Sequence, residues 1–126
     1  MGREPTGAIG DRAEQRAFQF LIERGLRPVA RNFRCRGGEI DLIMLDEQCL
    51  VFAEVRYRQS SRFTEPGLTV DHRKQRKIIR TAAFFSARHP AYASHVMRFD
   101  VVAVEGVDPP VIKWIRDAFR PNDSTL

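Results

Sequence analysis

Two strand-like segments of the chain each carry a carboxylate where an apolar side chain is expected. Asp41 interrupts the apolar run of residues 38–43, and Glu54 interrupts the run of residues 51–56. Burying a charge costs free energy unless the charge is paired or bound to a cation. Arg56 follows Glu54 by two positions, so both side chains project from one face of the strand. The pattern indicates a divalent-metal site suited to phosphodiester chemistry.

Length and composition predict one soluble domain. The chain has 126 residues, of which 43% are hydrophobic and 29% are charged, as in ordinary globular proteins. We expect a single domain over residues 1–126, with a core over about 7–119 and flexible tails over 1–6 and 120–126. The sequence has no apolar stretch long enough to span a membrane and no apolar signal core at its N-terminus. The expected location is therefore the cytoplasm, with no membrane partner.

The cysteines and histidines do not form a recognisable ligand set. Cys35 and Cys49 make no Cys-x-x-Cys pair and have no histidine at zinc-ligand spacing, so we expect both thiols to be reduced and structural. We expect His72, His89 and His95 at the surface, because none has an acidic or cysteine partner at ligand spacing.

Apolar periodicity and turn residues divide the chain into seven main elements. We expect a helix over 7–24 ending at Gly25, strands over 29–36, 39–45 and 49–57, a polar loop over 59–69, a helix from the N-cap Asp71 to residue 88, and strands over 96–104 and 111–115, followed by residues 116–119. The first three strands form an antiparallel meander. The order α-β-β-β-α-β-β predicts an α/β fold, with a central mixed β-sheet of about five strands flanked by helices.

Glu14 is a third carboxylate in an apolar place. On a helical wheel it lies in the middle of the apolar arc, beside Ala17 and Leu21. We therefore expect Glu14 to face the sheet and to meet Asp41 and Glu54 in a single seam between the helix and the sheet.

Each carboxylate has a simpler explanation when it is considered alone. Glu14 is explained by a buried arginine partner, Asp41 by a turn or edge position, and both Glu54 and Arg56 by a cross-strand salt bridge. Together these explanations weaken, because hard cations such as Mg²⁺ or Mn²⁺ bind oxygen ligands, keep several waters and need few carboxylates. The main-chain carbonyl of Val55 could supply one further oxygen. We expect Glu14, Asp41 and Glu54 to be the metal ligands.

Positive charge gathers around these carboxylates in a chain of net charge +5. Lys74 lies at the border of the second helix's basic face, where it could turn toward the carboxylates. A basic rim would give salt-dependent, sequence-independent affinity for phosphates, although a solvated helix face also explains such a charge run. Phe63 is a weaker candidate for base stacking. The expected nucleic-acid-binding residues are Arg31, Arg34, Arg36, Arg58, Arg73, Arg76, Lys77 and Arg80.

Several segments, in this order and spacing, resemble a known family. They are Gly10-Asp11-Arg12-Ala13-Glu14, Ala30-Arg31-Asn32-Phe33-Arg34, residues 38–43, residues 51–56, residues 70–77, Arg98-Phe99-Asp100-Val101-Val102 and Asp117-Ala118-Phe119. The chain resembles the PD-(D/E)xK nuclease superfamily, which has the restriction-endonuclease-like fold and includes archaeal Holliday-junction resolvases. It is most similar to the small bacterial YraN-like family of candidate endonucleases, over about residues 7–119.

The resemblance implies a residue set for cleavage of DNA. It places the metal-binding aspartate at Asp41, the glutamate of the (D/E)xK element at Glu54 and the helix glutamate at Glu14. The superfamily lysine falls on Arg56, which stays charged and cannot act as a general base, so Lys74 is expected to assist. The implied catalytic residues are Asp41, Glu54, Arg56 and Lys74, with Mg²⁺ or Mn²⁺ as cofactor. Branched DNA and a homodimer are the implied substrate and assembly.

Three functions remain open from the sequence. The first is a metal-dependent endonuclease, and the second is a nucleic-acid-binding module that kept the fold and lost the chemistry, which Arg56 favours. The third is a protein-interaction domain with a structural Glu-Arg seam, which predicts no salt-dependent binding to DNA.

Overall fold

The computed structural model describes residues 6–58, 70–106 and 109–122. The elements are α1 (Thr6–Glu23), β1 (Arg27–Cys35), β2 (Gly38–Asp46), β3 (Cys49–Arg58), α2 (His72–Arg88), the short 3-10 helix η2 (Pro90–Tyr92), β4 (Val96–Glu105) and β5 (Val111–Phe119). The expected order is confirmed, with η2 as an addition. The expectations for the outer parts of both tails and for the loop over 59–69, with Phe63, lie outside the described residues.

The five strands form one mixed sheet in the order β1-β2-β3-β4-β5. β3 and β4 run parallel, because α2 connects them, and the other neighbours are antiparallel. The antiparallel meander of the first three strands is confirmed. The sheet is therefore the mixed α/β sheet that the order of elements predicts.

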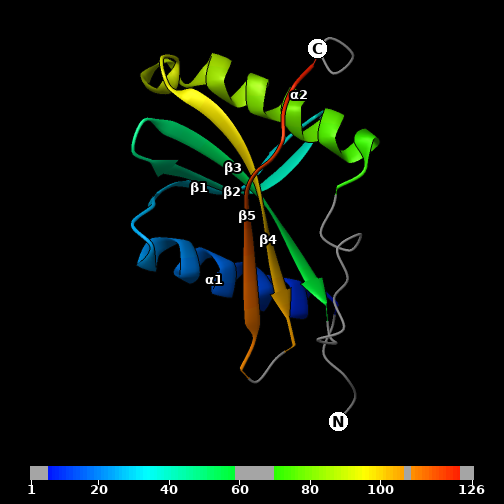
Figure 1. Ribbon diagram of the computed structural model, residues 1–126. Coiled ribbons are helices and arrows are strands. Elements are labelled where there is room, and N and C mark those ends of the chain that lie inside the picture. The colour runs from blue at the N-terminus through cyan, green and yellow to red at the C-terminus, as the bar shows by residue number, and fades with distance from the viewer. Residues whose placement is uncertain (1–5, 59–69, 107–108, 123–126) are drawn as a thin grey trace.

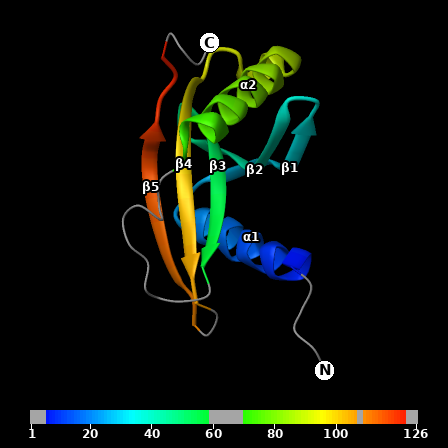
Figure 2. The same ribbon diagram turned by 90° about the vertical axis from the view of Figure 1, so that its right-hand side faces the viewer.

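The two helices cover opposite faces of the sheet (Figures 1 and 2). α1 packs through Ala17 and Leu21 on a core that includes Val51 and Val102. α2 packs on the other core, which includes Phe52 and Phe99 of the sheet; its own buried residues are Ile78, Ile79, Thr81, Ala82 and Phe85. Both cores need an apolar side chain at nearly every position of β3 and β4, which explains why these strands are continuous apolar runs.

The ends of both helices follow local sequence signals. α1 stops at Glu23, and Gly25 then adopts a φ of +94°, which glycine tolerates without strain. α2 begins after Asp71, whose Oδ1 accepts a hydrogen bond from the Lys74 backbone N–H at 2.8 Å. The N-cap expected at Asp71 is confirmed.

The sheet divides at one place, between β2 and β3. Their backbone pairing starts at the connecting turn and ends at Leu42 and Ala53. Both strands continue past that point, β2 paired with β1 as far as Gly38 and β3 paired with β4 as far as Arg58. We call the place where β2 and β3 diverge the fork. It leaves a gap in the backbone ladder that other groups must fill.

β2 does not keep strict alternation as it leaves the fork. Ile40 and Leu42 are two residues apart, yet Ile40 packs in the core under α2 and Leu42 in the core over α1. The strand therefore rotates about its axis near Asp41, which lies between them. Strict period-two alternation would place Asp41 on the same face as Ile43, and it does not describe this segment.

The last strand is longer than the sequence predicts. β5 continues through residues 116–119, where we expected the strand to end at Ile115. Asp117 adopts a φ of +55°, and the register shifts by a bulge near it. The bulge lets Phe119 pair with Phe99 and stack on its ring at 5.3 Å. The buried contact extends the strand across a polar segment.

The histidine prediction is wrong for two of the three residues. His72 is exposed, but His89 and His95 are half-buried. The ring of His89 stacks on Phe85 at 3.9 Å, and the ring of His95 lies edge-on to Tyr92. Aromatic packing at the end of α2 draws these rings inward, which ligand spacing could not predict. Cys35 and Cys49 are free thiols, as expected, and no helix in the described part of the chain could cross a membrane.

Candidate active site

The three carboxylates singled out in the sequence meet at the fork. Asp41 is on β2 and Glu54 on β3, immediately past the last backbone pair, and each is only 9% exposed. The Asp41 Oδ2 accepts a hydrogen bond from the Val55 backbone N–H at 2.8 Å. That side chain replaces the main-chain acceptor that the diverging strand no longer offers. Glu14 reaches the same place from α1, close enough for its carboxyl to raise the pKa of Asp41.

The expectation of one seam between a helix and the sheet needs correction. Glu14 comes from α1, whereas Lys74 comes from α2 on the opposite face (Figure 2). The Lys74 Nζ lies 3.1 Å from the Glu54 Oε2. Groups from both faces can meet because the strands separate at the fork. The candidate site is thus a gap within the sheet, between β2 and β3, that receives side chains from the helices on both faces.

Burial keeps the negative charge of this site poorly compensated. Desolvation raises the pKa of Asp41 to about 6, and the neighbouring Glu14 carboxyl raises it further against the Val55 hydrogen bond. Desolvation also raises the pKa of Glu54 to about 7, with Asp41 adding to the rise and Lys74 opposing it. The pKa of Glu14 is raised by burial too. Carboxyls with raised pKa values gather where a protein holds charge for binding or catalysis.

Arg56 lies close enough to Glu54 to influence its carboxyl. It is half-buried on β3, and its charge lowers the pKa of Glu54, although less than Lys74 does. The site therefore holds two cations against three carboxyls. Arg56 thus contributes a positive charge next to the buried carboxylates.

The donor set fits a hydrated hard cation better than a closed protein cage. Among the residues that the structure describes, no three carboxylate, histidine or cysteine side chains converge closely enough to enclose a metal ion. Mg²⁺, however, keeps several waters and binds through one or two carboxylates. Asp41 and Glu54 supply two carboxylates from neighbouring strands. Their raised pKa values indicate that the ionised forms are destabilised, and a bound cation would stabilise them. The residues present therefore fit Mg²⁺ or Mn²⁺ held mainly by this pair.

The basic residues named in the sequence surround the fork unevenly. The hairpin of β1 and β2 lies against α2, where a Cβ on Gly38 would be 3.0 Å from the Thr81 Oγ1 and 3.7 Å from the Lys77 side chain. The structure thus brings the hairpin's arginines beside the basic face of α2. We call these residues the basic rim: Arg34, Arg36, Arg73, Arg76, Lys77 and Arg80. All are exposed except the half-buried Arg76.

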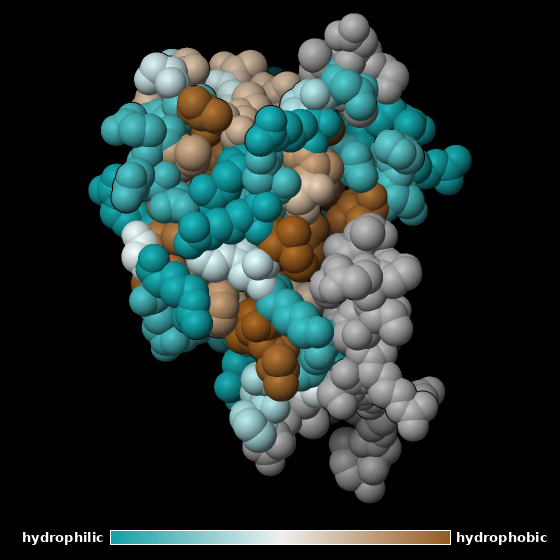
Figure 3. Space-filling model, in the orientation of Figure 1, coloured by the Kyte–Doolittle hydropathy of each residue, from teal (hydrophilic) through white to brown (hydrophobic). Residues whose placement is uncertain are grey.

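Three of the arginines expected to bind nucleic acid have other neighbours in the structure. The Arg34 Nε is 3.2 Å from the Glu39 Oε1, so part of its charge is neutralised. The Arg31 guanidinium stacks over the Phe18 ring at 4.4 Å, on the α1 side of the fork. Arg58 ends β3 in register with Glu105. Figure 3 shows that much of the face toward the viewer is hydrophilic, with apolar patches between polar side chains.

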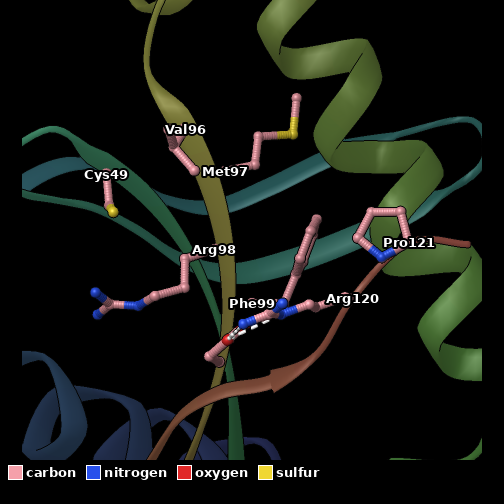
Figure 4. Close-up of a pocket in the computed structure, with 8 residues that line it drawn as sticks. Cys49, Val96, Met97, Arg98, Phe99, Arg120 and Pro121 are labelled. Carbon is pink, nitrogen blue, oxygen red and sulfur yellow. Dashed lines mark hydrogen bonds and ion pairs between the residues drawn. The ribbon is translucent and has the colours of Figure 1, made fainter.

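A separate hollow of about 500 Å³ lies away from these carboxylates, near the start of β4 and the end of β5 (Figure 4). Its charged groups already have partners. Arg98 is bound by Asp46 and Asp100, and Arg120 is bound by Asp117. The hollow therefore offers no free charge for a ligand, and the fork remains the better candidate site.

The sequence analysis did not single out two residues that the structure makes conspicuous, Asn32 and Asp100. Asn32 on β1 is hydrogen-bonded to the Glu14 side chain; the only signal was a polar turn-forming residue inside a strand. Asp100 on β4 is a fully buried carboxylate, and it interrupts an apolar run just as Asp41 does. Its partners are Arg98, Trp114 and the Asp117 backbone N–H, so the same signal can mark a site or a buried hydrogen-bond network.

Comparison with known proteins decides the family. A profile of the uncharacterised protein family UPF0102 matches residues 13–104. The chain belongs to the UPF0102 family. This result confirms the YraN-like assignment made from the sequence. The matched region contains Glu14, Asp41, Glu54 and the whole of α2.

UPF0102 proteins of several bacteria align over nearly the whole chain. A relative from Xanthomonas oryzae pv. oryzae (strain PXO99A) is 50% identical over 114 residues, which are 90% of this chain and 93% of the relative. One from Xanthomonas campestris pv. campestris (strain B100) is 50% identical over 121 residues, or 96% of each chain. One from Pseudomonas putida (strain W619) is 43% identical over 118 residues, covering 92% and 95%. This UPF0102 protein is thus similar in length as well as in sequence to these relatives.

Proposed function

We propose that this UPF0102 protein is a Mg²⁺- or Mn²⁺-dependent nuclease-fold protein that binds DNA and cleaves its phosphodiester bonds. The observation that carries the proposal is the meeting of two buried strand carboxylates, Asp41 and Glu54, at the fork. Their pKa values are raised toward neutrality, and the basic rim lies on the adjoining surface. Branched or otherwise structured DNA is the proposed substrate, and a homodimer would allow both strands to be cut.

In this proposal each residue acts through a contact already described. Asp41 and Glu54 would hold the divalent cation, with Glu14 as a further ligand. When bound, the cation would supply polarisation of a phosphoryl oxygen and a lowered pKa for the attacking water. Lys74 orients Glu54 through its 3.1 Å ion pair. Arg56 presents a fixed positive charge toward the phosphate and stabilises negative charge there. The basic rim binds flanking phosphates without reading bases.

Arg56 supports a second candidate, a nucleic-acid-binding protein without cleavage activity. A lysine can lose its proton near a nucleophilic water, whereas an arginine cannot. In that case the basic rim still binds DNA, and the carboxylates are retained for stability or metal binding alone.

The decisive experiment incubates the purified protein with linear, nicked and four-way-junction DNA, in Mn²⁺ or in EDTA. Asp41→Asn is the informative variant, because its amide oxygen can still accept the Val55 hydrogen bond while the charge is removed. Glu39→Gln is a matched control on the same strand, since Glu39 is exposed. We expect Mn²⁺-dependent cleavage that Asp41→Asn abolishes and Glu39→Gln preserves.

The other outcomes separate the candidates. Salt-sensitive binding without cleavage would favour the second function, and a gain of cleavage in Arg56→Lys would show that the arginine limits the chemistry. Cleavage that persists in EDTA and in Asp41→Asn would rule out the metal site.

A further inference from the structure

Asn32 has an unusual backbone conformation inside a strand. Its φ is +52°, in the left-handed region that L-residues rarely adopt. Asparagine tolerates this region better than most residues, but it remains uncommon within a strand. The neighbouring pairs Arg31–Leu42 and Phe33–Ile40 place Asn32 directly opposite Asp41 across the β1–β2 ladder. The conformation therefore occurs next to the candidate site.

The side chain of Asn32 also contacts the site. Its hydrogen bond to the Glu14 side chain lowers the pKa of Glu14 against the larger effect of burial, and Glu14 in turn lies close enough to Asp41 to raise the pKa of Asp41. The side-chain NH₂ is the only donor group in the side chain of Asn32, so it is the group that donates to a Glu14 carboxylate oxygen. Residues in sparsely populated conformations persist where the surroundings hold them, and they gather at functional sites. Asn32 links β1 to α1 at the place where β2 rotates about its axis.

We infer that Asn32 is a positioning residue, whose side-chain amide holds the Glu14 carboxyl against Asp41 at the fork. The inference rests on the proposed function, because it gives the Glu14–Asp41 pair a role in holding the cation. Groups that orient metal ligands commonly change metal affinity by about 10- to 100-fold when they are removed.

The first test measures Mn²⁺ affinity by isothermal titration calorimetry, with the melting temperature of the metal-free protein measured in parallel. Asn32→Gly removes the amide and permits the same φ. Glu47→Gly is the matched control, because Glu47 has a φ of +55° in the turn between β2 and β3. We expect Asn32→Gly to bind Mn²⁺ at least about 10-fold more weakly than wild type, while Glu47→Gly binds it normally. Unchanged Mn²⁺ affinity in Asn32→Gly would overturn the inference.

A metal-free measurement separates this inference from the proposed function. The side-chain amide of Asn32 should give an NMR signal that shifts in Glu14→Ala and stays in place in the neighbouring control Gln15→Ala. If the wild type binds no Mn²⁺ but the signal behaves in this way, the metal function fails and the positioning role stands. If the signal is the same in wild type and Glu14→Ala, the positioning role is refuted whatever the metal result.

Discussion

Two buried aspartates on strands of this sheet have opposite electrostatic surroundings. Asp100 accepts hydrogen bonds from the Arg98 Nε and Nη2, the Trp114 Nε1 and the Asp117 backbone N–H, all within 3.0 Å. Asp41 accepts one from the Val55 backbone N–H and faces other carboxyls. A fully paired buried carboxylate stabilises the structure that surrounds it, whereas one among like charges does not.

This contrast predicts opposite effects of two substitutions on the free energy of unfolding. Asp100→Ala leaves the Arg98 charge without its main partner and should cost about 3–5 kcal/mol. Asp41→Asn removes a poorly compensated charge but keeps the acceptor, so at pH 8 it should leave stability unchanged or raise it. Urea denaturation at pH 8 measures both. A loss in Asp41→Asn comparable to that in Asp100→Ala would contradict this account.

The raised pKa values also predict how stability depends on pH. Asp41 and Glu54 have ordinary pKa values of 3.8 and 4.5 and folded-state values of about 6 and 7. Between about pH 4 and pH 7 the folded protein therefore binds more protons than the unfolded chain, and stability falls as the pH rises. The wild type should lose on the order of 5 kcal/mol of stability across this range, and the Asp41→Asn, Glu54→Gln double variant should not show this decline. Melting curves from pH 4 to pH 8 measure the difference, and parallel profiles for variant and wild type would refute the prediction.

At the scale of single elements, the start of α2 determines where Lys74 lies. The Asp71 side chain caps the helix through the Lys74 backbone N–H, and the same residue's Nζ reaches Glu54. One residue thus joins the helix end to the fork. The N-cap fixes the first turn, and the first turn places a cation beside the buried carboxylate.

Removing this cap should affect both stability and the site. Asp71→Ala should cost about 1 kcal/mol of unfolding free energy, and Asp71→Ser should recover most of it, because serine is also a good N-cap. Loosening of Lys74 should raise the pKa of Glu54 further in Asp71→Ala, since Lys74 now lowers it. NMR titration of the Glu54 carboxyl measures this shift. The same pKa in Asp71→Ala and wild type would show that Lys74 is held by other contacts.

At the scale of the whole molecule, the basic rim brings together positive charge from two separate elements. The basic rim combines the β1–β2 hairpin with the outer face of α2, and the contact at Gly38 keeps the two together. β5 forms the opposite edge of the sheet. A rim of this kind would bind DNA by neutralising phosphates, with an affinity that falls steeply as salt increases.

Two matched double variants test whether the position of the charges matters. Arg73→Gln, Arg80→Gln removes two charges from the rim, and Arg88→Gln, Arg116→Gln removes two from the far end of α2 and from β5. The rim variant should reduce the slope of log affinity against log salt by about 2, close to one unit for each lost phosphate contact. The control variant should keep the slope. Fluorescence anisotropy with labelled DNA measures both, and equal slopes would indicate a merely solvated helix face.

The sequence determined much of this protein by local rules. Asp71 and Gly25 predicted helix ends, the apolar runs predicted the central strands, and the order of elements predicted the mixed sheet. The conspicuous carboxylates Asp41 and Glu54 could be chosen because a charge in an apolar run is visible without any structure. These features depend on neighbours in the chain, and the sequence contains that information directly.

Only the tertiary structure decided which buried charges belong together. Asp41 and Asp100 look alike in the sequence, but long-range contacts pair Asp100 with Trp114 and bring Asp41 to Glu14. The fork, the rotation of β2 and the left-handed Asn32 arise where strand pairing ends, which no local pattern specifies. Whether a buried carboxylate is satisfied or left among like charges depends on groups distant in sequence, because desolvation and pairing act through space.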